Sequence, residues 1–544
     1  MNRFLKSLVV MNSVSLVLSL FYVLSPGEGI FWNAYGILAI LTLTGNIAAS
    51  IIKPDQKKWS ALYLVLSSAG MIGIMVLTTL ASLDPADTAS RSLVAIVLFL
   101  SLFVVGTLLA GISFLHTNRR GHTRRTLSRQ TETTFVKVVR ITLRVLLGFV
   151  LLVGVFLAVT MVTSVSVGVI EAAVSPYSLF FSFIFLSTAG LFLKVSPFDW
   201  RSLKGMSVLL IGTTLYVVFG LPFFSIPAML EEAEENYTAA FGDDWQDDDE
   251  TVPAFKELPV SLPAFFFGTP SGNYELEEDV QYYQGDSGVD EGLDLRFDVY
   301  TPTENAADLP GQGSVLIRIH GGGWNSGDKG PENFSQVNKY FAEQGYVVFD
   351  VQYGLNAARQ FSGLLSAPDD VTGDFSVKDM VRHLGLFTTY LADHHERYDA
   401  DIDSVFVSGG SAGGHLANAL ALGASSGQYT ELIDTRITVK GIIPFYPAND
   451  LASFPGVGDA EELIDPALLV EEDSPPALVY QGTLDTLVEP QVTIAFKEAY
   501  VEANNSDIAI IWLPYGSHAS DLYFTGVYNQ TFLYYMERFM YQFR

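Results

Sequence analysis

The chain of 544 residues contains no cysteine, only 8 histidines and few basic residues. The absence of cysteine excludes a disulfide framework, a thiolate metal site and a cysteine nucleophile. Its 31 Lys and Arg are far outnumbered by 59 Asp and Glu, which gives a net charge of −28. So strongly acidic a chain is not expected to bind nucleic acid.

Charge of either sign is also unevenly distributed. Residues 1–230 hold 7 acidic and 17 basic residues, for a net charge of +10, whereas residues 231–544 hold 52 and 14, for a net charge of −38. The apolar residues are concentrated in the first part. We therefore expect a membrane domain at 1–230 and an acidic soluble domain after it.

Seven apolar stretches in the first part reach the length of about 20 residues that a membrane-spanning helix needs. They lie near residues 5–25, 30–52, 60–82, 92–115, 143–166, 176–195 and 206–229. The fifth apolar run continues to about Val174, so its surplus is expected at the membrane interface. The ionisable residues Lys6, Arg144, Glu171 and Lys194 lie near helix ends, where snorkelling explains them. An all-α anchor or scaffold is the prediction for this domain.

The basic residues between the stretches predict the orientation. Arg3 and Lys6 precede the first stretch, and further basic residues fill the second, fourth and sixth connections, at 53–58, 116–140 and 194–204. The other three connections contain only Arg91. By the positive-inside rule the N-terminus is cytoplasmic, and seven crossings place residues after 230 outside the cytoplasm. We expect an integral protein of the plasma membrane.

Residues 231–275 are predicted to be an acidic linker. Ten carboxylates fall within residues 231–250, and a run of this kind is typical of a solvated spacer. Calcium binding is the alternative, but the spacing lacks the glycine and glutamate positions of an EF-hand loop.

From residue 276 to 544, short β-rich runs alternate with helical stretches, which is typical of an α/β fold with a mostly parallel sheet. The predicted strands are Leu295–Tyr300, Ser314–Ile319, Tyr346–Gln352, Ser404–Val407, Gly441–Phe445, Ala477–Tyr480 and Ile508–Leu513. The predicted helices are 334–344, 376–394, 411–423, 489–503 and 524–541. Ligands bind such sheets at the carboxyl ends of the strands.

Ser411 is the candidate nucleophile. It follows a predicted strand and opens a predicted helix, in the sequence Gly409-Gly410-Ser411-Ala412-Gly413. The glycines permit a sharp turn that exposes the serine hydroxyl, although a simple Gly/Ser turn is the alternative. A serine hydroxyl needs a base to become a good nucleophile.

The base follows by elimination. In the order serine, acid, histidine, the base lies after Ser411, where only His415 and His518 occur. His415 is one helical turn beyond Ser411 and better placed for packing, whereas His518 lies in a loop after the last strand. We expect His518 to act as the base.

The acid that orients the base is expected at Asp485, which follows the strand Ala477–Tyr480. Asp450, after the preceding strand, is the alternative, with turn capping as its other role. The carboxyl end of the strand places Asp485 beside the histidine loop.

The string His320-Gly321-Gly322-Gly323 is the candidate oxyanion hole. Without Cβ atoms the backbone can approach a substrate and point its N–H groups at a developing negative charge. Gly321 and Gly322 are the expected donors, with the amide of Ala412. His320 is expected to fix this loop.

Residues from about 276 to 544 resemble the α/β-hydrolase superfamily, in the carboxylesterase branch with hormone-sensitive-lipase-like and feruloyl or acetyl esterases. The stretches that carry the resemblance are His320-Gly321-Gly322-Gly323-Trp324, Tyr398 through His415, and Gly482-Thr483-Leu484-Asp485-Thr486-Leu487-Val488. The resemblance implies Ser411, Asp485 and His518 as triad and Gly321, Gly322 and Ala412 as oxyanion hole. The chain departs from the branch at Gly410, at Gln481 and at Tyr353-Gly354-Leu355. No family is recognised in residues 1–230.

Together these features predict a membrane-anchored serine carboxylesterase or lipase-like hydrolase that acts outside the cytoplasm. Its substrate is expected to be a small-molecule, lipid or glycan ester, with no cofactor or metal required. Two alternatives stay open. One is an acyltransferase that acts on a lipid or surface glycan, and the other is a non-catalytic receptor or scaffold with a hydrolase fold.

Overall fold

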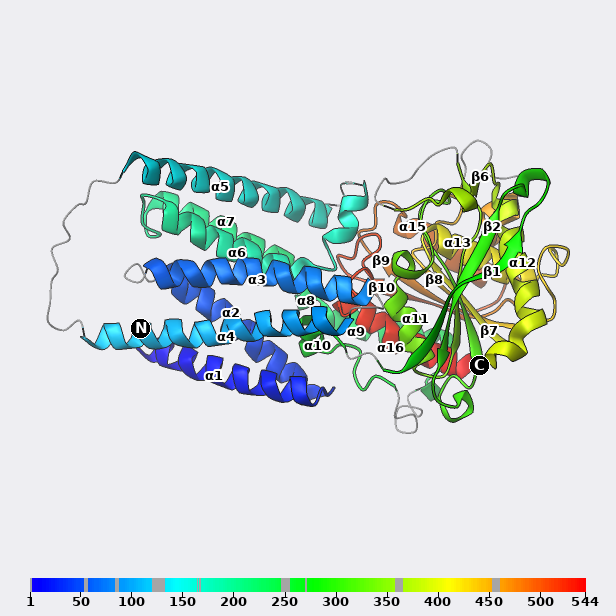
Figure 1. Cartoon of the computed structure of the whole chain (residues 1–544), viewed down its shortest axis with the longest axis horizontal. Coiled ribbons are helices and arrows are strands. Elements are labelled where there is room, and N and C mark those ends of the chain that lie inside the picture. The colour runs from blue at the N-terminus through cyan, green and yellow to red at the C-terminus, as the bar shows by residue number, and fades with distance from the viewer. Residues whose placement is uncertain are drawn as a thin grey trace.

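The computed structural model describes residues 2–52, 57–83, 88–119, 133–163, 165, 168–245, 255–269, 272–357, 365–452 and 460–544. A helical part built from the N-terminal residues lies end to end with an α/β part built from the C-terminal residues (Figure 1). The helix axes run along the long axis of the molecule, toward the α/β part.

Proline separates the helices of the N-terminal part. The seven longer helices α1 to α7 contain no proline, and the five described prolines before residue 230 lie outside them, because a proline ring removes a backbone donor and interrupts a helix. Six of these helices are long and apolar enough to cross a membrane, fewer than the seven spans predicted. The seventh predicted span, near 206–229, is divided, because α7 has only 17 residues and ends at Phe219. Their bounds are α1 Asn2–Leu24, α2 Ile30–Ile52, α3 Lys57–Leu83, α4 Thr88–Arg119, α5 Thr134–Thr163, α6 Ser178–Val195 and α7 Leu203–Phe219.

Successive helices alternate in direction (Figure 1). The start of α1 and the ends joined by the connections α2–α3, α4–α5 and α6–α7 lie far from the α/β part. The end of α3, the start of α4, the end of α5 and the start of α6 lie against it. The described helix ends that flank the connections predicted to be basic therefore lie at the end of the bundle opposite the α/β part.

The start of the expected acidic linker is a helix with a buried face, which differs from the solvated spacer predicted for it. After the short helix α8 (Leu221–Phe224), α9 spans Ile226–Phe241 and contacts strand β10. Met229, Ala233, Tyr237 and Phe241 are buried at a spacing of four, while the intervening carboxylates are exposed. The acidic residues 247–250 lie outside the described residues.

The α/β part contains one sheet of eight strands in the order β1-β2-β4-β3-β7-β8-β9-β10. β1 pairs with β2 and β2 with β4 in antiparallel fashion, and the remaining pairs are parallel. All seven predicted strands are confirmed, and β1 is an additional edge strand. The bounds are β1 Tyr274–Gln284, β2 Asp294–Pro302, β3 Ser314–Ile319, β4 Val347–Val351, β7 Asp401–Gly410, β8 Val439–Phe445, β9 Ala477–Gly482 and β10 Ile508–Leu513, with a two-stranded ribbon of β5 Leu355–Asn356 and β6 Thr372–Gly373.

The five helices predicted for the α/β part are also confirmed. Helices α12 and α13 pack on each other, and α13 lies on strands β7 and β8. The bounds are α11 Ser335–Ala342, α12 Val377–His394, α13 Ala412–Ser425, α15 Pro490–Glu502 and α16 Val527–Phe543, with a single turn α14 at Glu461–Ile464.

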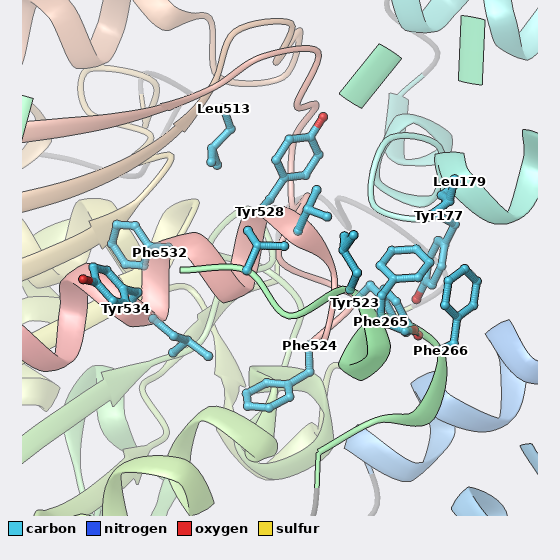
Figure 2. Close-up of a cluster of buried hydrophobic side chains, with 14 of the residues drawn as sticks. Tyr177, Leu179, Phe265, Phe266, Leu513, Tyr523, Phe524, Tyr528, Phe532 and Tyr534 are labelled. Carbon is cyan, nitrogen blue, oxygen red and sulfur yellow. The ribbon is translucent and has the colours of Figure 1, made fainter. Parts of the chain in front are cut away.

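A shared hydrophobic cluster joins the two parts (Figure 2). The short helix α10 (Leu262–Phe267) carries three phenylalanines into this cluster. The ring of Phe265 stacks on Phe180 of α6 at 4.9 Å, and the ring of Phe266 stacks on Phe99 of α4 at 4.8 Å. From the α/β part, the Tyr523 hydroxyl donates to the carbonyl of Phe265.

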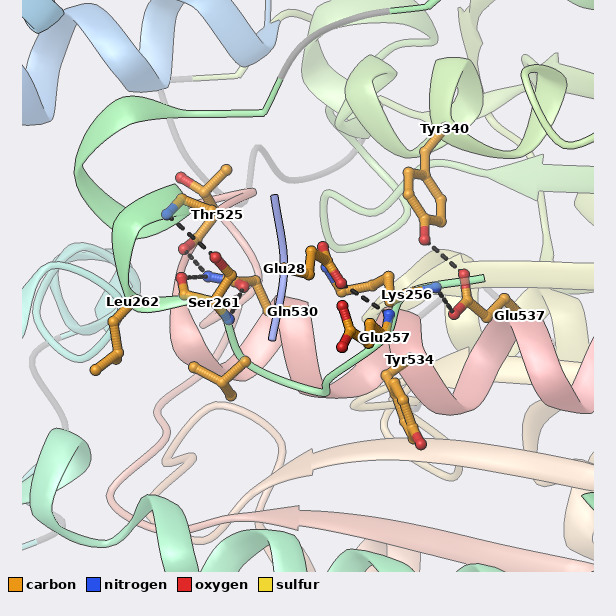
Figure 3. Close-up of polar contacts among 12 residues, drawn as sticks. Glu28, Lys256, Glu257, Ser261, Leu262, Tyr340, Thr525, Gln530, Tyr534 and Glu537 are labelled. Atoms are coloured by element: carbon orange, nitrogen blue, oxygen red, sulfur yellow. Dashed lines mark hydrogen bonds and ion pairs between the residues drawn. The ribbon is translucent and has the colours of Figure 1, made fainter. Parts of the chain in front are cut away.

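Polar contacts fix the segment that precedes α10 to helix α16 (Figure 3). The Gln530 side-chain carbonyl accepts from the Ser261 amide at 2.7 Å, and the buried Glu537 carboxylate accepts from the Lys256 amide at 2.7 Å. Lys256 in turn forms a 3.1 Å ion pair with Glu28, which lies between α1 and α2. The helical part is thus docked on the α/β part by both apolar and polar contacts.

Candidate active site

The Ser411 turn has the backbone geometry of an exposed nucleophile. Ser411 joins β7 to α13 with φ of 55° and ψ of −119°, a sparsely populated conformation for a residue with a Cβ atom. Glycine is required on both sides of it, because a Cβ at Gly409 would lie 2.4 Å from the Gly413 carbonyl oxygen. A Cβ at Gly413 would lie 2.2 Å from the carbonyl oxygen of Ile319.

His518 and Asp485 form a buried pair. The Nδ1 atom of His518 lies 2.8 Å from Oδ2 of Asp485, and the two residues are only 5% and 2% exposed. The other carboxylate oxygen accepts from the amides of Leu487 and Val488 at 3.0 and 2.8 Å, which fixes its orientation. Because a carboxylate only accepts, the proton of the neutral ring is on Nδ1 and Nε2 is left as a base.

The charges around His518 favour its protonated form. Burial by itself lowers the pKa of His518, but the carboxylates of Asp485, Glu171 and Asp521 outweigh burial, so the pKa is raised above its ordinary 6.5. A carboxylate partner that stabilises an imidazolium suits a residue that takes up a proton during a reaction.

Ser411 and His518 line one cavity of about 320 Å³, together with Gly321 and Gly322. This volume is at the lower end of the range typical of small-molecule sites. Asp485 is not among the lining residues and contacts His518 from outside the cavity. Ala412 is buried at the first position of α13, where a backbone amide has no partner within the helix.

The glycines of the oxyanion candidate lie directly against the Ser411 turn. A Cβ at Gly321 would lie 2.7 Å from the Gly410 carbonyl oxygen, and Gly322 has a φ of +122° that strongly favours glycine. His320 stacks on Tyr353, with ring centroids 4.5 Å apart, and its Nδ1 lies 2.9 Å from the Gly321 carbonyl oxygen. These contacts fit the expected role of His320 in fixing the loop.

The structure gives the two alternative residues other surroundings. Both ring nitrogens of His415 are engaged, Nδ1 by the Trp324 indole N–H at 3.0 Å and Nε2 with the Leu463 carbonyl at 2.8 Å. Burial lowers the pKa of His415 to about 4. The side chain of Asp450 is exposed. Neither residue is among those lining the cavity of Ser411.

Several polar residues near His518 are not found by the sequence motifs. The ring of Tyr446 lies 4.6 Å from the His518 ring, and its hydroxyl donates to Asp521 at 2.8 Å. Burial raises the pKa of the Asp521 carboxyl to about 6. Arg318 also lines the cavity. Asp521 lies three residues after His518, which is the one signal in the sequence that could have indicated it.

Glu171 is the residue for which the sequence interpretation is wrong. It is 6% exposed in a turn between α5 and α6, rather than extended toward solvent or lipid headgroups. Its carboxylate accepts hydrogen bonds from Thr486 and from the His518 amide. The signal available in the sequence was its rarity, as one of seven acidic residues before residue 230.

Within the described residues, no group of three or more His, Asp or Glu side chains is arranged to hold a metal ion.

Comparison with known proteins extends the sequence resemblance. Residues 297–463 match the family model BD-FAE, a stretch that includes Gly321, Gly322, Ser411 and Ala412. This match, to a family model of the α/β-hydrolase type, lies within the α/β part of the chain.

The hydrolase domain is also similar to two Mycobacterium tuberculosis proteins. The "Probable carboxylic ester hydrolase LipM" is 26% identical over 239 residues, which are 40% of this chain and 51% of LipM. "Esterase LipQ" is 25% identical over 232 residues, which are 38% of this chain and 50% of LipQ. The chain thus spans about half the length of each relative.

Among solved structures, the apo form of Thermogutta terrifontis esterase 2 is similar, at 23% identity and a TM-score of 0.37. That match covers 50% of this chain and 92% of the esterase.

Proposed function

We propose that this chain is a membrane-anchored serine carboxylic ester hydrolase. Ser411 in a strained turn shares one cavity with the glycine loop and with His518, which is paired with the buried Asp485, and this arrangement carries the proposal. The similarity of the domain to proteins named as ester hydrolases supports the same reaction class.

In the proposed mechanism, Nε2 of His518 removes the proton of the Ser411 hydroxyl as the serine oxygen attacks the ester carbonyl. The oxyanion is stabilised by the amides of Gly321, Gly322 and Ala412, each contributing up to about 3 kcal/mol. His518 then protonates the leaving alcohol, and an acyl-serine forms. A water molecule deprotonated by the same histidine releases the acid and restores the serine.

We further propose that residues 1–230 anchor the enzyme, with its N-terminus in the cytoplasm and the hydrolase domain outside. Six apolar helices support membrane insertion. Because successive helices alternate in direction, α7 as a seventh span would place the hydrolase domain on the side of the membrane opposite the N-terminus. The helix ends that flank the basic connections lie opposite the hydrolase domain, which supports this orientation.

The test uses the full chain in detergent with p-nitrophenyl acetate and a fluorophosphonate probe. We expect Ser411→Ala to abolish both turnover and labelling, because no other group takes the place of the activated hydroxyl. Ser425→Ala, at the far end of the same helix, should leave both unchanged. Undiminished turnover by Ser411→Ala would contradict the proposal.

Product analysis separates hydrolysis from acyl transfer. A hydrolase releases free acid in water at the same rate whether or not an acceptor alcohol is present. A rate that depends on an added glycan or lipid alcohol, with the acyl group recovered on it, would favour the acyltransferase alternative.

A further inference from the structure

The turn between helices α5 and α6 reaches into the catalytic part of the hydrolase domain. It comprises a short 3-10 helix at Gly168–Ala173 and then Ser175, and it belongs to the helical part of the chain. Two loops of the hydrolase domain receive it, the Asp485–Thr486 loop after β9 and the Ser517–His518 loop after β10.

Glu171 bridges these two loops. Its Oε1 accepts from the Thr486 amide at 3.1 Å and from the His518 amide at 3.4 Å, and its Oε2 accepts from the Thr486 hydroxyl. Thr486 is the residue next to Asp485, so one carboxylate contacts the backbone beside both members of the acid–base pair.

The backbone around Glu171 strengthens this contact. The Ser517 hydroxyl donates to the Glu171 carbonyl at 2.7 Å, and the Ser517 amide donates to the Ser175 hydroxyl at 3.1 Å. The hydroxyls of Ser175 and Ser517 also lie 2.7 Å apart. In each of these contacts, the partner of Ser517, which precedes His518, belongs to the helical part.

Such a carboxylate is costly to bury unless its oxygens are hydrogen-bonded. At 6% exposure Glu171 is among the few buried acidic side chains, and its described acceptor contacts lead to the hydrolase domain. An anchor that merely tethers the domain has no need of a buried carboxylate beside the catalytic histidine.

We propose that Glu171 is a positioning residue of the active site, through which the helical part holds the His518 and Asp485 loops in register. The hydrolase site is then complete only when the helical part is docked on it. This inference rests on the proposed function and adds a residue from outside the hydrolase fold to the machinery around the triad.

The charge of Glu171 provides a readout that a purely structural contact lacks. The titratable groups around His518 are Asp485, Glu171, Asp521 and Tyr446, and the three carboxylates each raise the pKa of His518. Removal of one negative charge therefore lowers that pKa, and the acid limb of the rate profile moves to lower pH.

The experiment compares Glu171→Gln and Glu171→Ala in the full chain, with kcat and KM for p-nitrophenyl acetate measured against pH. A misplacement of about 1 Å in catalytic geometry costs on the order of 10²-fold, so we expect Glu171→Ala to lower kcat by about 10- to 100-fold with little change in KM. Glu171→Gln keeps an acceptor oxygen, so it should retain more activity and show the pH shift.

The matched control is Glu28→Gln. The Glu28 carboxylate also joins the helical part to a distant segment, because it accepts hydrogen bonds from the Lys256 side chain and the Glu257 amide. It should leave kcat and the pH profile unchanged. Wild-type kcat and profile in both Glu171 variants, or an equal loss in Glu28→Gln, would overturn the inference. Activity surviving in Ser411→Ala would instead overturn the proposed function itself.

A second inference comes from the wall of the cavity. Leu83, the last residue of α3, and Ala172 line it from the helical part, together with Phe334, Leu487 and Leu522 of the hydrolase domain. The cavity is thus lined both by residues at the ends of the helical part and by residues of the hydrolase domain.

If α3 and α5 span a bilayer, this cavity is at the membrane surface. An ester with a long apolar acyl chain can then reach Ser411 from the bilayer without the chain crossing water, because transfer of each methylene into water is unfavourable. We infer that the substrate is a lipid ester whose acyl chain lies along the Leu83 and Ala172 wall. This also rests on the proposed function.

The test measures kcat/KM for p-nitrophenyl laurate and p-nitrophenyl acetate with the full chain. We expect laurate to be preferred, and Leu83→Trp, which fills the wall, to lower laurate turnover about tenfold or more while acetate is little affected. Leu468→Trp, on an exposed surface of the hydrolase domain, is the control. The inference would be overturned if the enzyme preferred acetate or an acetylated sugar and if Leu83→Trp did not change its preference for acyl-chain length.

Discussion

At the scale of single residues, the His518–Asp485 contact determines how the proposed chemistry depends on pH. The neutral ring accepts the serine proton, so activity falls as pH drops through the pKa of His518. Because nearby carboxylates raise that pKa, the acid limb of kcat/KM should lie above pH 6.5.

Asp485→Asn is expected to lower kcat by on the order of 10⁴-fold, because an amide no longer fixes the ring tautomer or stabilises the imidazolium. Loss of the charge also lowers the pKa of His518, so the residual activity should persist to lower pH than in the parent. Steady-state rates over a pH series check both effects. An acid limb that stays in place or moves upward would contradict this assignment of the acid.

The candidate triad was predictable because each of its members has a local signal in the sequence. Ser411 is flanked by glycines, and His518 and Asp485 each follow a predicted strand in the required order. Glu171 was misinterpreted because its partners lie more than 300 residues away, and no local pattern encodes such a contact.

At the scale of elements, the turn from β7 to α13 depends on the absence of side chains at its glycines. Gly413→Ala would place a Cβ 2.2 Å from the carbonyl oxygen of Ile319 and 2.6 Å from that of His320. Both neighbours are backbone atoms, which cannot move aside as a flexible side chain can. We expect about 1–3 kcal/mol of destabilisation, as for overpacked cores, and a lower midpoint of thermal unfolding.

Gly111→Ala is the control for this substitution. Gly111 lies within α4, and an added Cβ there meets nothing within 4 Å. The same methyl group should therefore be neutral or slightly stabilising in the helix. Equal midpoints for the two variants would contradict the steric argument.

Elements with a strong apolar pattern were predictable, and those without one were not. The buried strand β10 is a continuous apolar run and β3 is mostly apolar, and the predicted bounds of both are those observed. Strand β1 was missed because its residues are mostly exposed and many are charged. Helix α9 was missed because its carboxylates concealed an apolar residue at every fourth position.

At the scale of the whole molecule, the absence of cysteine allows a direct test of orientation. Single cysteines can be introduced at Ser287, exposed in the hydrolase domain, and at Lys204, exposed at the opposite end of the bundle. A membrane-impermeant maleimide should label Ser287→Cys in intact cells, and Lys204→Cys only after permeabilisation. The reverse pattern would contradict the proposed topology.

The division into a helical and an α/β part was readable from the distribution of charge and apolar residues. How the parts dock was not, because docking uses residues that look ordinary in the sequence. The three phenylalanines of α10, for example, resemble any short apolar run until the hydroxyl of Tyr523 and the rings of α4 and α6 are placed around them.

The docking of α10 and α16 has a consequence for biosynthesis. Residues 256 and 261 bond to residues of α16 that are made more than 260 positions later, and the cluster beneath them also needs α4 and α6. The nascent chain therefore emerges with its helices made but their shared cluster open. A ribosome that stalls before α16 would leave this apolar cluster accessible to chaperones and proteases, so the two parts can dock only after α16 has been translated.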